Sequence, residues 1–100
     1  MSKISTFKND NVEFDLFAGA IIFVNFKRKF GKSLNEALAV DSSDMDALSF
    51  VVHEGYKCAC GFKSAEVKLS QEDILNRLTI EDLLKCFQLL YPSDDQKKTK

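Results

Sequence analysis

Four side chains in this sequence could bind a metal ion: His53, Cys58, Cys60 and Cys86. Imidazole nitrogen and thiolate sulfur are ligands that zinc prefers, so a small metal-binding regulatory or adaptor domain using His53, Cys58 and Cys60 is one hypothesis. The spacing argues against it. In one helix, Cys58 and Cys60 would lie about 200° apart around the axis, because each residue turns roughly 100°. We therefore favour free thiols, unless the helix ends at Gly55 and leaves both cysteines in a loop.

Catalysis would need a different arrangement of the same side chains. A cysteine nucleophile activated by His53 requires a third group that orients the imidazole, and no nucleophile motif or phosphate-binding glycine loop is present. The acidic residues fall at predicted helix starts, where capping and the helix dipole explain them. These residues are Asp44, Asp46, Glu72, Asp73, Glu81 and Asp82. We predict that the protein is not an enzyme and carries no cofactor.

A basic run, Lys27-Arg28-Lys29, lies between Phe26 and Phe30 and could bind single-stranded nucleic acid by charge and stacking. The net charge of −1 argues against an electrostatic nucleic-acid binder. Positive charge is also favourable at the C-terminus of a helix. We predict that these side chains serve the helix and that the protein does not bind nucleic acid.

That helix is predicted over 16–30, with Asp15 as its N-cap and Gly31 as its left-handed C′ residue. Its first turns are apolar on nearly every side, which is typical of a helix enclosed by the rest of a domain. We therefore expect it to be the central helix. It is too short, and too charged at one end, to cross a bilayer, so no membrane association is predicted.

Before this helix, short apolar segments over 4–7 and 12–16 flank Asn9-Asp10-Asn11. Asn and Asp are typical of tight turns, so a β-hairpin is expected.

Three further helices are expected from the middle of the chain onward. Ser33 and Glu36 have the spacing of a capping box before a short helix over 34–40. A helix beginning at Met45 would end with Gly61 at C′ and Phe62 at C″. Gly55 inside it implies close packing or an early end. Residues 62–69 are expected to form a connector. The run Ser70-Gln71-Glu72-Asp73 begins another helix, and Leu69 and Ile74 have the spacing of a hydrophobic staple.

The last helix, over 80–91, is the clearest amphipathic segment. It begins at Thr79, where Leu78 and Leu83 have the spacing of a second hydrophobic staple. Pro92 ends it. The predicted fold class is α+β and predominantly α, with an N-terminal β-hairpin, a central apolar helix and about four further helices. One domain would span 1–92, followed by a disordered charged tail over 93–100.

Three cysteines, without a recognisable export signal, suggest a reducing, cytoplasmic setting.

The order of these elements resembles the phage tail assembly chaperone family of long-tailed phages and prophages. The resemblance runs from Val12 to Tyr91. It rests on three patterns. The first is the phenylalanine spacing in the first helix, the second is a helix with the pattern Ala-Leu-x-x-Val-Val-x-x-Gly, and the third is a helix start with the pattern Leu-Ser-x-Glu-Asp-Ile. The residues are Phe14, Phe17, Ala18, Phe23, Phe26, Phe30, Gly31, Lys32, Ser33, Leu34, Ala47, Leu48, Val51, Val52, Gly55, Leu69, Ser70, Glu72, Asp73 and Ile74.

The resemblance implies a non-enzymatic protein of the host bacterial cytoplasm that is absent from the mature virion. It would bind the tape measure protein and keep it soluble while the tail tube assembles. The tail tube protein and a frameshifted longer form of the chaperone are further expected partners. Gln96-Lys97-Lys98 can be encoded as CAA AAA AAG, a run on which a ribosome can slip.

The predicted mechanism is capture of an apolar helix by an exposed apolar surface. The candidate partner-binding residues are Leu83, Phe87, Leu90 and Tyr91, on one face of the last helix. The same spacing is typical of a core face, so both roles stay open here, as does homo-oligomerisation through this stripe.

Overall fold

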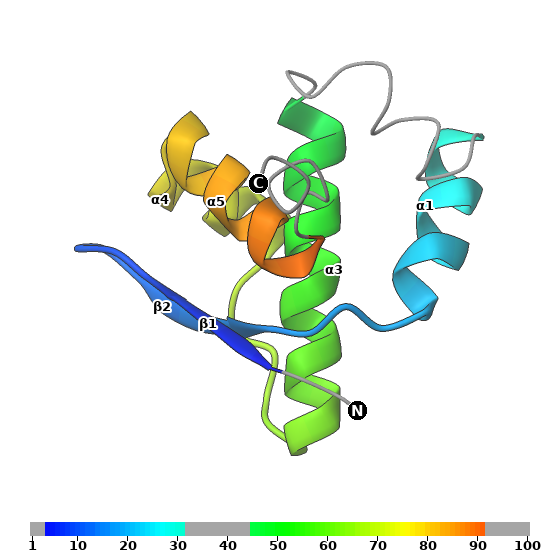
Figure 1. Ribbon diagram of the computed structural model, residues 1–100, viewed down its shortest axis with the longest axis horizontal. Coiled ribbons are helices and arrows are strands. Elements are labelled where there is room, and N and C mark those ends of the chain that lie inside the picture. Colours follow the sequence, from blue (N-terminus) through cyan, green and yellow to red (C-terminus); the bar gives the residue numbers. More distant parts are fainter. Residues whose placement is uncertain (1–3, 32–44, 92–100) are drawn as a thin grey trace, which may run out of the picture.

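A long helix, α3 (Met45–Lys63), runs through the middle of the fold, and strand β2 and three other helices pack against it (Figure 1). The computed structural model describes residues 4–31 and 45–91. The α+β, mostly helical class predicted from the sequence is confirmed. The predicted helix over 34–40, its Ser33 cap and the tail over 93–100 lie outside the described residues. The other elements are β1 (Ser5–Lys8), β2 (Glu13–Leu16), α1 (Ile21–Phe30), α4 (Gln71–Arg77) and α5 (Ile80–Leu90).

The predicted hairpin is confirmed as β1 and β2, which pair antiparallel with Phe7 opposite Phe14. Its turn is closed by Asn9, whose amide donates to the Val12 carbonyl at 2.9 Å. The side chain of Asn9 accepts hydrogen bonds from the amides of Asn11 at 2.7 Å and Val12 at 2.8 Å. Asn at this position therefore has the turn role that the sequence predicted.

The predicted N-cap at Asp15 is wrong, because Asp15 belongs to β2 and α1 starts only at Ile21. The Asp15 carboxylate accepts a hydrogen bond from Thr6 on the neighbouring strand at 2.7 Å and pairs with Lys63. No side chain caps α1 at Ala20. The other end was predicted correctly: Gly31 has φ +76° and its amide donates to the carbonyl of the residue four before it.

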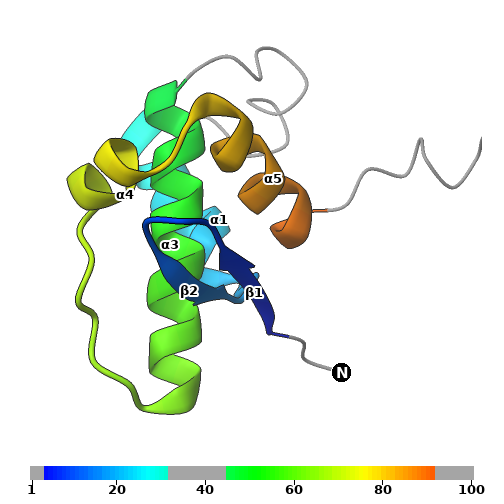
Figure 2. The same ribbon diagram turned by 90° about the vertical axis from the view of Figure 1, so that its left-hand side faces the viewer.

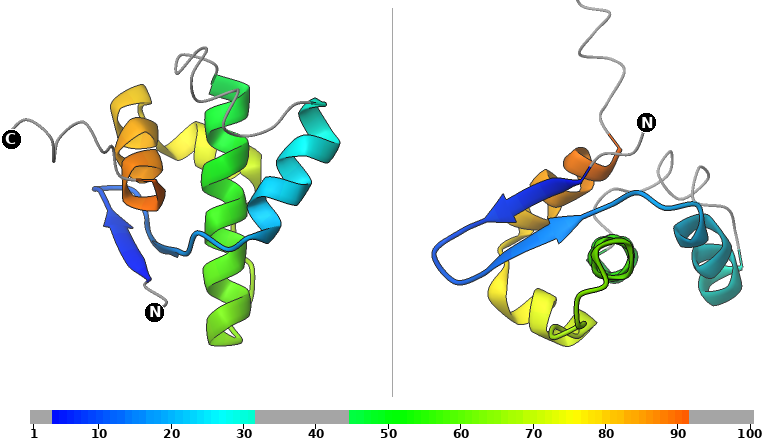
Figure 3. Two further views of the ribbon diagram at one scale, coloured as in Figure 1. Left: turned by 45° about the vertical axis from the view of Figure 1, so that its right-hand side comes forward. Right: turned by 90° about the horizontal axis from the view of Figure 1, so that it is seen from below.

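The expectation that this helix is central is also wrong. Only Ile22 and Phe26 of α1 are buried, and both face α3. Ile21, Phe23 and Val24 are 50%, 40% and 44% exposed. Figure 3 shows α1 at the margin of the fold, on the opposite side of α3 from α4. Composition alone could not distinguish an enclosed helix from one with an exposed apolar face.

Helix α3 passes through both of its internal glycines. At Gly55 the backbone lies against Leu90 and Leu16, so that an added Cβ would be 2.9 Å from two Leu90 methyl carbons. The close packing expected there is confirmed, and the early end is excluded. The predicted end at Gly61 is wrong: the helix continues to Lys63.

A Schellman motif ends α3 with Ser64, not glycine, as the left-handed C′ residue at φ +58°. The Ala65 amide donates to the Cys60 carbonyl at 2.7 Å, and the Ser64 amide to the Gly61 carbonyl at 3.2 Å. The chain then passes along residues 65–70 into α4, and we call this segment the connector.

The predicted helix starts at Ser70 and Thr79 are confirmed, and each is closed by a capping box. The Ser70 hydroxyl accepts from the Asp73 amide at 3.1 Å, and the Thr79 hydroxyl accepts from the Asp82 amide at 3.0 Å. Asp82 also accepts a hydrogen bond at 3.0 Å from the side chain of Asn9 in the hairpin turn. The start of α5 is therefore tied to the hairpin, which lies beside it in Figure 2.

One core joins the hairpin to all four described helices. Phenylalanine and aliphatic side chains from β1, β2 and α1 meet the inner faces of α3, α4 and α5. Its members are Phe7, Phe14, Leu16, Ile22, Phe26, Val51, Val52, Tyr56, Cys60, Ile74, Leu78, Leu83, Cys86 and Leu90.

Candidate functional site

His53 lies on α3 and holds the connector in place. Its Nε2 atom is 2.8 Å from the Leu69 carbonyl oxygen, which fixes the neutral ring with that nitrogen as donor. Burial is the main cause that lowers the pKa of His53 below its ordinary value of 6.5. No hydrogen bond within the described residues joins this imidazole to a thiol. His53 therefore has a structural partner already.

The three cysteines point in different directions and are all free thiols. Cys58 lies beside Gly19, and the Cys60 Sγ donates to the Glu66 carbonyl at 3.7 Å. Cys86 is fully buried in α5. Because α3 continues through Gly55, the loop that could have brought Cys58 and Cys60 together does not exist. Among residues 4–31 and 45–91, no group of three or more His, Cys, Asp or Glu side chains could hold a metal ion.

Burial also makes two of these thiols poor nucleophiles. It raises the pKa of Cys58, and it raises the pKa of Cys86 to about 12. Thiolate is the reactive form of cysteine, so a raised pKa disfavours nucleophilic attack near neutral pH.

The four residues predicted to bind a partner do not form one exposed stripe. Leu83 and Leu90 are buried in the core, where Leu90 packs against Gly55. Phe87 and Tyr91 are partly exposed and contact each other, with ring centroids 5.6 Å apart. The two leucines therefore have the core role, which was the alternative interpretation of their spacing. With the protein in this conformation, a partner could contact only Phe87 and Tyr91 of the four.

These two rings continue onto α1. The Phe23 ring meets Tyr91 edge-on at a centroid distance of 5.9 Å. Ile21, Phe23 and Val24 are exposed around the first turn of α1, and we call this apolar turn the α1 face. Sequence reasoning missed it because it placed the whole helix inside. One signal was available: a helix that ends in three consecutive basic residues must present part of its surface to water.

Tyr91 marks the junction between the two helices. Its hydroxyl is buried and has no hydrogen-bond partner among the residues that the structure describes. Burial is the main cause that raises the pKa of Tyr91 to about 12. The hydroxyl is thus a neutral group under an apolar surface.

Beyond the α1 face, the same helix carries Lys27, Arg28 and Lys29, all exposed. The Lys29 ammonium lies 5.7 Å from the ring centroids of both Phe30 and Phe50, a cation–π arrangement. The three basic side chains thus lie in the last turn of α1, and Lys29 lies beside two aromatic rings.

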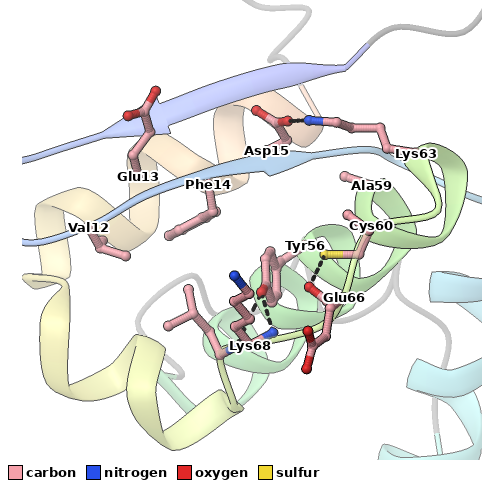
Figure 4. Close-up of a pocket in the computed structure, with 12 residues that line it drawn as sticks. Val12, Glu13, Phe14, Asp15, Tyr56, Ala59, Cys60, Lys63, Glu66 and Lys68 are labelled. Atoms are coloured by element: carbon pink, nitrogen blue, oxygen red, sulfur yellow. Dashed lines mark hydrogen bonds and ion pairs between the residues drawn. The ribbon is translucent and has the colours of Figure 1, made fainter.

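A groove of about 480 Å³ lies on the other side of α3, between β2 and the connector (Figure 4). Tyr56, Ala59 and Cys60 of α3 form its floor. Its two walls are made by Val12, Glu13, Phe14 and Asp15 on one side and by Lys63, Ala65, Glu66, Lys68 and Leu69 on the other.

The floor and the far wall of this groove are joined by specific hydrogen bonds. The Tyr56 hydroxyl accepts from the amides of Lys68 at 2.7 Å and Leu69 at 3.2 Å. At one end, the hydrogen bond from Lys63 is the main cause that lowers the pKa of Asp15, and Thr6 adds to it. Apart from Lys63 and Asp15, no ion pair among the described residues crosses between the walls.

Comparison with known proteins gives no relative: no protein-family model, no curated protein and no solved structure matches this chain. Within the described part of the chain, no helix combines the length and the apolar character needed to cross a membrane.

Proposed function

We propose that this protein is a non-enzymatic chaperone that covers the apolar side of a helical partner, as phage tail assembly chaperones do for the tape measure protein. The observation that carries the proposal is the α1 face. Ile21, Phe23 and Val24 are large, exposed apolar side chains in the first turn of one helix. Exposed apolar surface of this kind is typical of sites that bind another protein.

The surface continues from α1 onto α5 through ring contacts. Phe23 meets Tyr91, and Tyr91 meets Phe87, so two helices contribute to one apolar region. Apolar side chains contributed by two helices can receive a third helix, which presents its own apolar stripe to them. The partly exposed members of the predicted set, Phe87 and Tyr91, would then contact the partner together with the α1 face.

The charges beside this surface define the partner further. Lys27, Arg28 and Lys29 follow the apolar turns of α1 and are exposed. A helix that docks along α1 would be held best if acidic side chains flank its apolar stripe, because complementary charge increases the rate and specificity of association. A long, helical, otherwise aggregating tape measure protein fits this description where its stripe is bordered by Asp or Glu.

The resemblance in element order gives the biological setting of the proposal. The protein would act in the host bacterial cytoplasm during tail assembly and would not remain in the mature virion. The tail tube protein and a longer form of the same chain, made by frameshifting, are further proposed partners.

The proposal is tested by co-expressing this protein with the tape measure protein that we expect to be encoded beside its gene. We expect the soluble fraction of the tape measure protein to rise when the chaperone is present. Val24→Asp places a charge in the α1 face at an exposed position, so it should abolish the effect without unfolding the protein.

Leu75→Asp is the matched control, because Leu75 is an aliphatic side chain with similar exposure, 40% against 44% for Val24, but lies on α4. It should leave the solubilising effect intact. Equal solubility with Val24→Asp and wild type would contradict a role for the α1 face. A gene neighbourhood without any long helical protein would contradict the proposed class.

A further inference from the structure

Each strand of the hairpin, including β2, has an outer edge at which backbone groups face away from the partner strand. In an antiparallel pair, alternate residues exchange hydrogen bonds with the opposite strand, and the residues between them point their amides and carbonyls outward. Asn9 and Val12 form a hydrogen-bonded pair. The register then makes Phe7 and Phe14 the next such pair. Glu13 and Asp15 therefore direct their backbone N–H and C=O groups away from β1.

A hydrogen bond just beyond β2 confirms this direction. The Phe17 amide, next in the same alternation, donates to the Gly55 carbonyl of α3 at 3.0 Å. For Glu13 and Asp15, no backbone hydrogen bond on this outer edge is formed with any residue of 4–31 or 45–91. Strand β2 thus presents up to four unpaired backbone groups.

These groups face the groove described above. The groove is lined by four residues around β2 and by the connector, and by none from β1, so it lies on the open side of the hairpin. Figure 4 shows β2 between β1 and the space above Tyr56. An unpaired strand edge in a walled groove differs from an edge in open solvent, because the opposite wall restricts what can approach.

The opposite wall is held independently of β2. Three side chains of α3 form hydrogen bonds with the backbone of the connector. Tyr56 accepts from the amides of Lys68 and Leu69, His53 donates to the Leu69 carbonyl, and Cys60 donates to the Glu66 carbonyl. The connector is thereby fastened to α3, and the space between it and β2 stays open.

We propose that this groove binds an extended peptide segment of a partner protein, which adds to β2 as a third strand. Its backbone would pair with Glu13 and Asp15. Every second side chain would point toward Tyr56 and Cys60 and would be apolar, while the alternate side chains would face solvent beside Glu13 and would be basic.

The groove selects a single strand over a second copy of the hairpin. An extended chain could enter along this groove of about 480 Å³, whereas pairing β2 with β2 of another copy would bring a whole domain against the connector. The charges support a basic segment. Five charged side chains line the groove, and two of them, Asp15 and Lys63, pair with each other. Glu13 and Glu66 form no ion pair among the described residues, so two acidic side chains stand against one basic side chain, Lys68.

This site is separate from the α1 face. Seen from below in Figure 3, α1 lies on one side of α3, and the connector lies on the other. The inference does not depend on the helical partner proposed above, and either can fail alone.

The test uses a blocked hexapeptide of alternating valine and lysine, titrated into the full chain labelled with ¹⁵N. We expect the amide signals of Glu13 and Asp15 to shift and their hydrogen exchange to slow by at least about tenfold at saturation. The same peptide with every backbone amide N-methylated cannot form the ladder in either strand orientation and should not bind. A version with glutamate in place of lysine should bind at least about threefold more weakly.

Glu13→Pro is the decisive variant, because proline removes an amide that has no partner in the fold and is tolerated on an edge strand. It should weaken binding by at least about tenfold, while Glu13→Gln keeps the amide and should lose only the preference for lysine over glutamate. Unchanged binding by a folded Glu13→Pro would overturn the proposal. If that variant does not fold, the wild-type exchange measurement decides: no slowing at Glu13 and Asp15, or equal binding of the N-methylated peptide, would overturn it.

Discussion

Gly55 and Gly61 lie in the same helix but have different surroundings. An added Cβ at Gly55 would be 2.9 Å from two Leu90 methyl carbons and 3.4 Å from Leu16, whereas at Gly61 nothing lies within 4 Å. Alanine favours a helix over glycine by about 1 kcal/mol, and overpacking a core costs about 1–3 kcal/mol. The two positions should therefore respond to alanine with opposite signs.

We predict that Gly55→Ala lowers the free energy of unfolding by about 1 kcal/mol and that Gly61→Ala raises it by about 0.5–1 kcal/mol. Urea denaturation of both variants beside wild type measures this. An equal gain at both positions would show that Leu90 does not pack against Gly55.

His53 gives the folded protein a dependence on pH near neutrality. Its pKa is lowered from 6.5, mainly by burial. As pH falls below about 6.5, the unfolded chain binds a proton that the folded state binds only at lower pH. The stability that neutral His53 contributes is therefore complete above 6.5 and is lost as pH falls toward the folded pKa. The lowered carboxyl pKa values of Asp15, Asp73 and Asp82 act below 3.8 and lie outside this window.

We predict that His53→Gln reduces the loss of stability between about pH 7.5 and pH 5.5, because glutamine can still donate to the Leu69 carbonyl but does not titrate. Urea midpoints at the two pH values measure the effect. If wild type and variant lose the same stability over this range, protonation of His53 is not the cause.

At the scale of elements, the starts of α4 and α5 followed from the sequence because capping boxes are local. Ser70 and Thr79 each bond the amide three residues later, so the pattern and the structure involve the same few atoms. The end of α3 did not follow. Gly61 is the better residue for a left-handed C′, but Ser64 takes that place. Beyond Gly61, the Phe62 ring stacks on Phe17 at a centroid distance of 5.2 Å, and Lys63 pairs with Asp15. Propensity was overridden there by tertiary contact.

Asp82 links two elements, because its carboxylate accepts from the Thr79 amide at 3.2 Å and from the Asn9 side chain at 3.0 Å. We predict that Asp82→Ala lowers the free energy of unfolding by about 1–2 kcal/mol, since it removes the cap and the contact with the hairpin turn. Glu81→Ala changes an exposed acid in the same helical turn and should cost less than about 0.5 kcal/mol. Similar values for the two variants, from thermal or urea unfolding, would contradict the linking role of Asp82.

At the scale of the whole molecule, the sequence predicted the fold class but not which helix is central. Helices α1 and α3 are both rich in apolar residues, and their relative positions depend on contacts between distant segments. Leu16 and Leu90, for example, meet at Gly55. The groove was missed for the same reason, since its walls are brought together only by the bonds of Tyr56 and His53 to the connector.

The marginal position of α1 has a consequence for local stability. It packs on α3 through Ile22 and Phe26, and Asn25 donates to the buried carboxylate of Glu54 at 2.8 Å. Helix α3, in contrast, is packed on several sides. We predict that amides of α1 exchange at least about tenfold faster than those in the middle of α3 under native conditions. Equal protection, measured by NMR hydrogen exchange, would show that α1 opens only with the whole fold.

The central claim is that the exposed apolar face of α1 contacts a helical partner. The most direct measurement is site-specific photocrosslinking in cells that also make the tape measure protein, with the photoreactive residue placed at Val24 or, as a control, at Ile80. Ile80 is 60% exposed but lies at the start of α5. We predict a crosslink to the tape measure protein from position 24 and none from position 80. Crosslinks from position 80 alone, or from neither position, would contradict the claim.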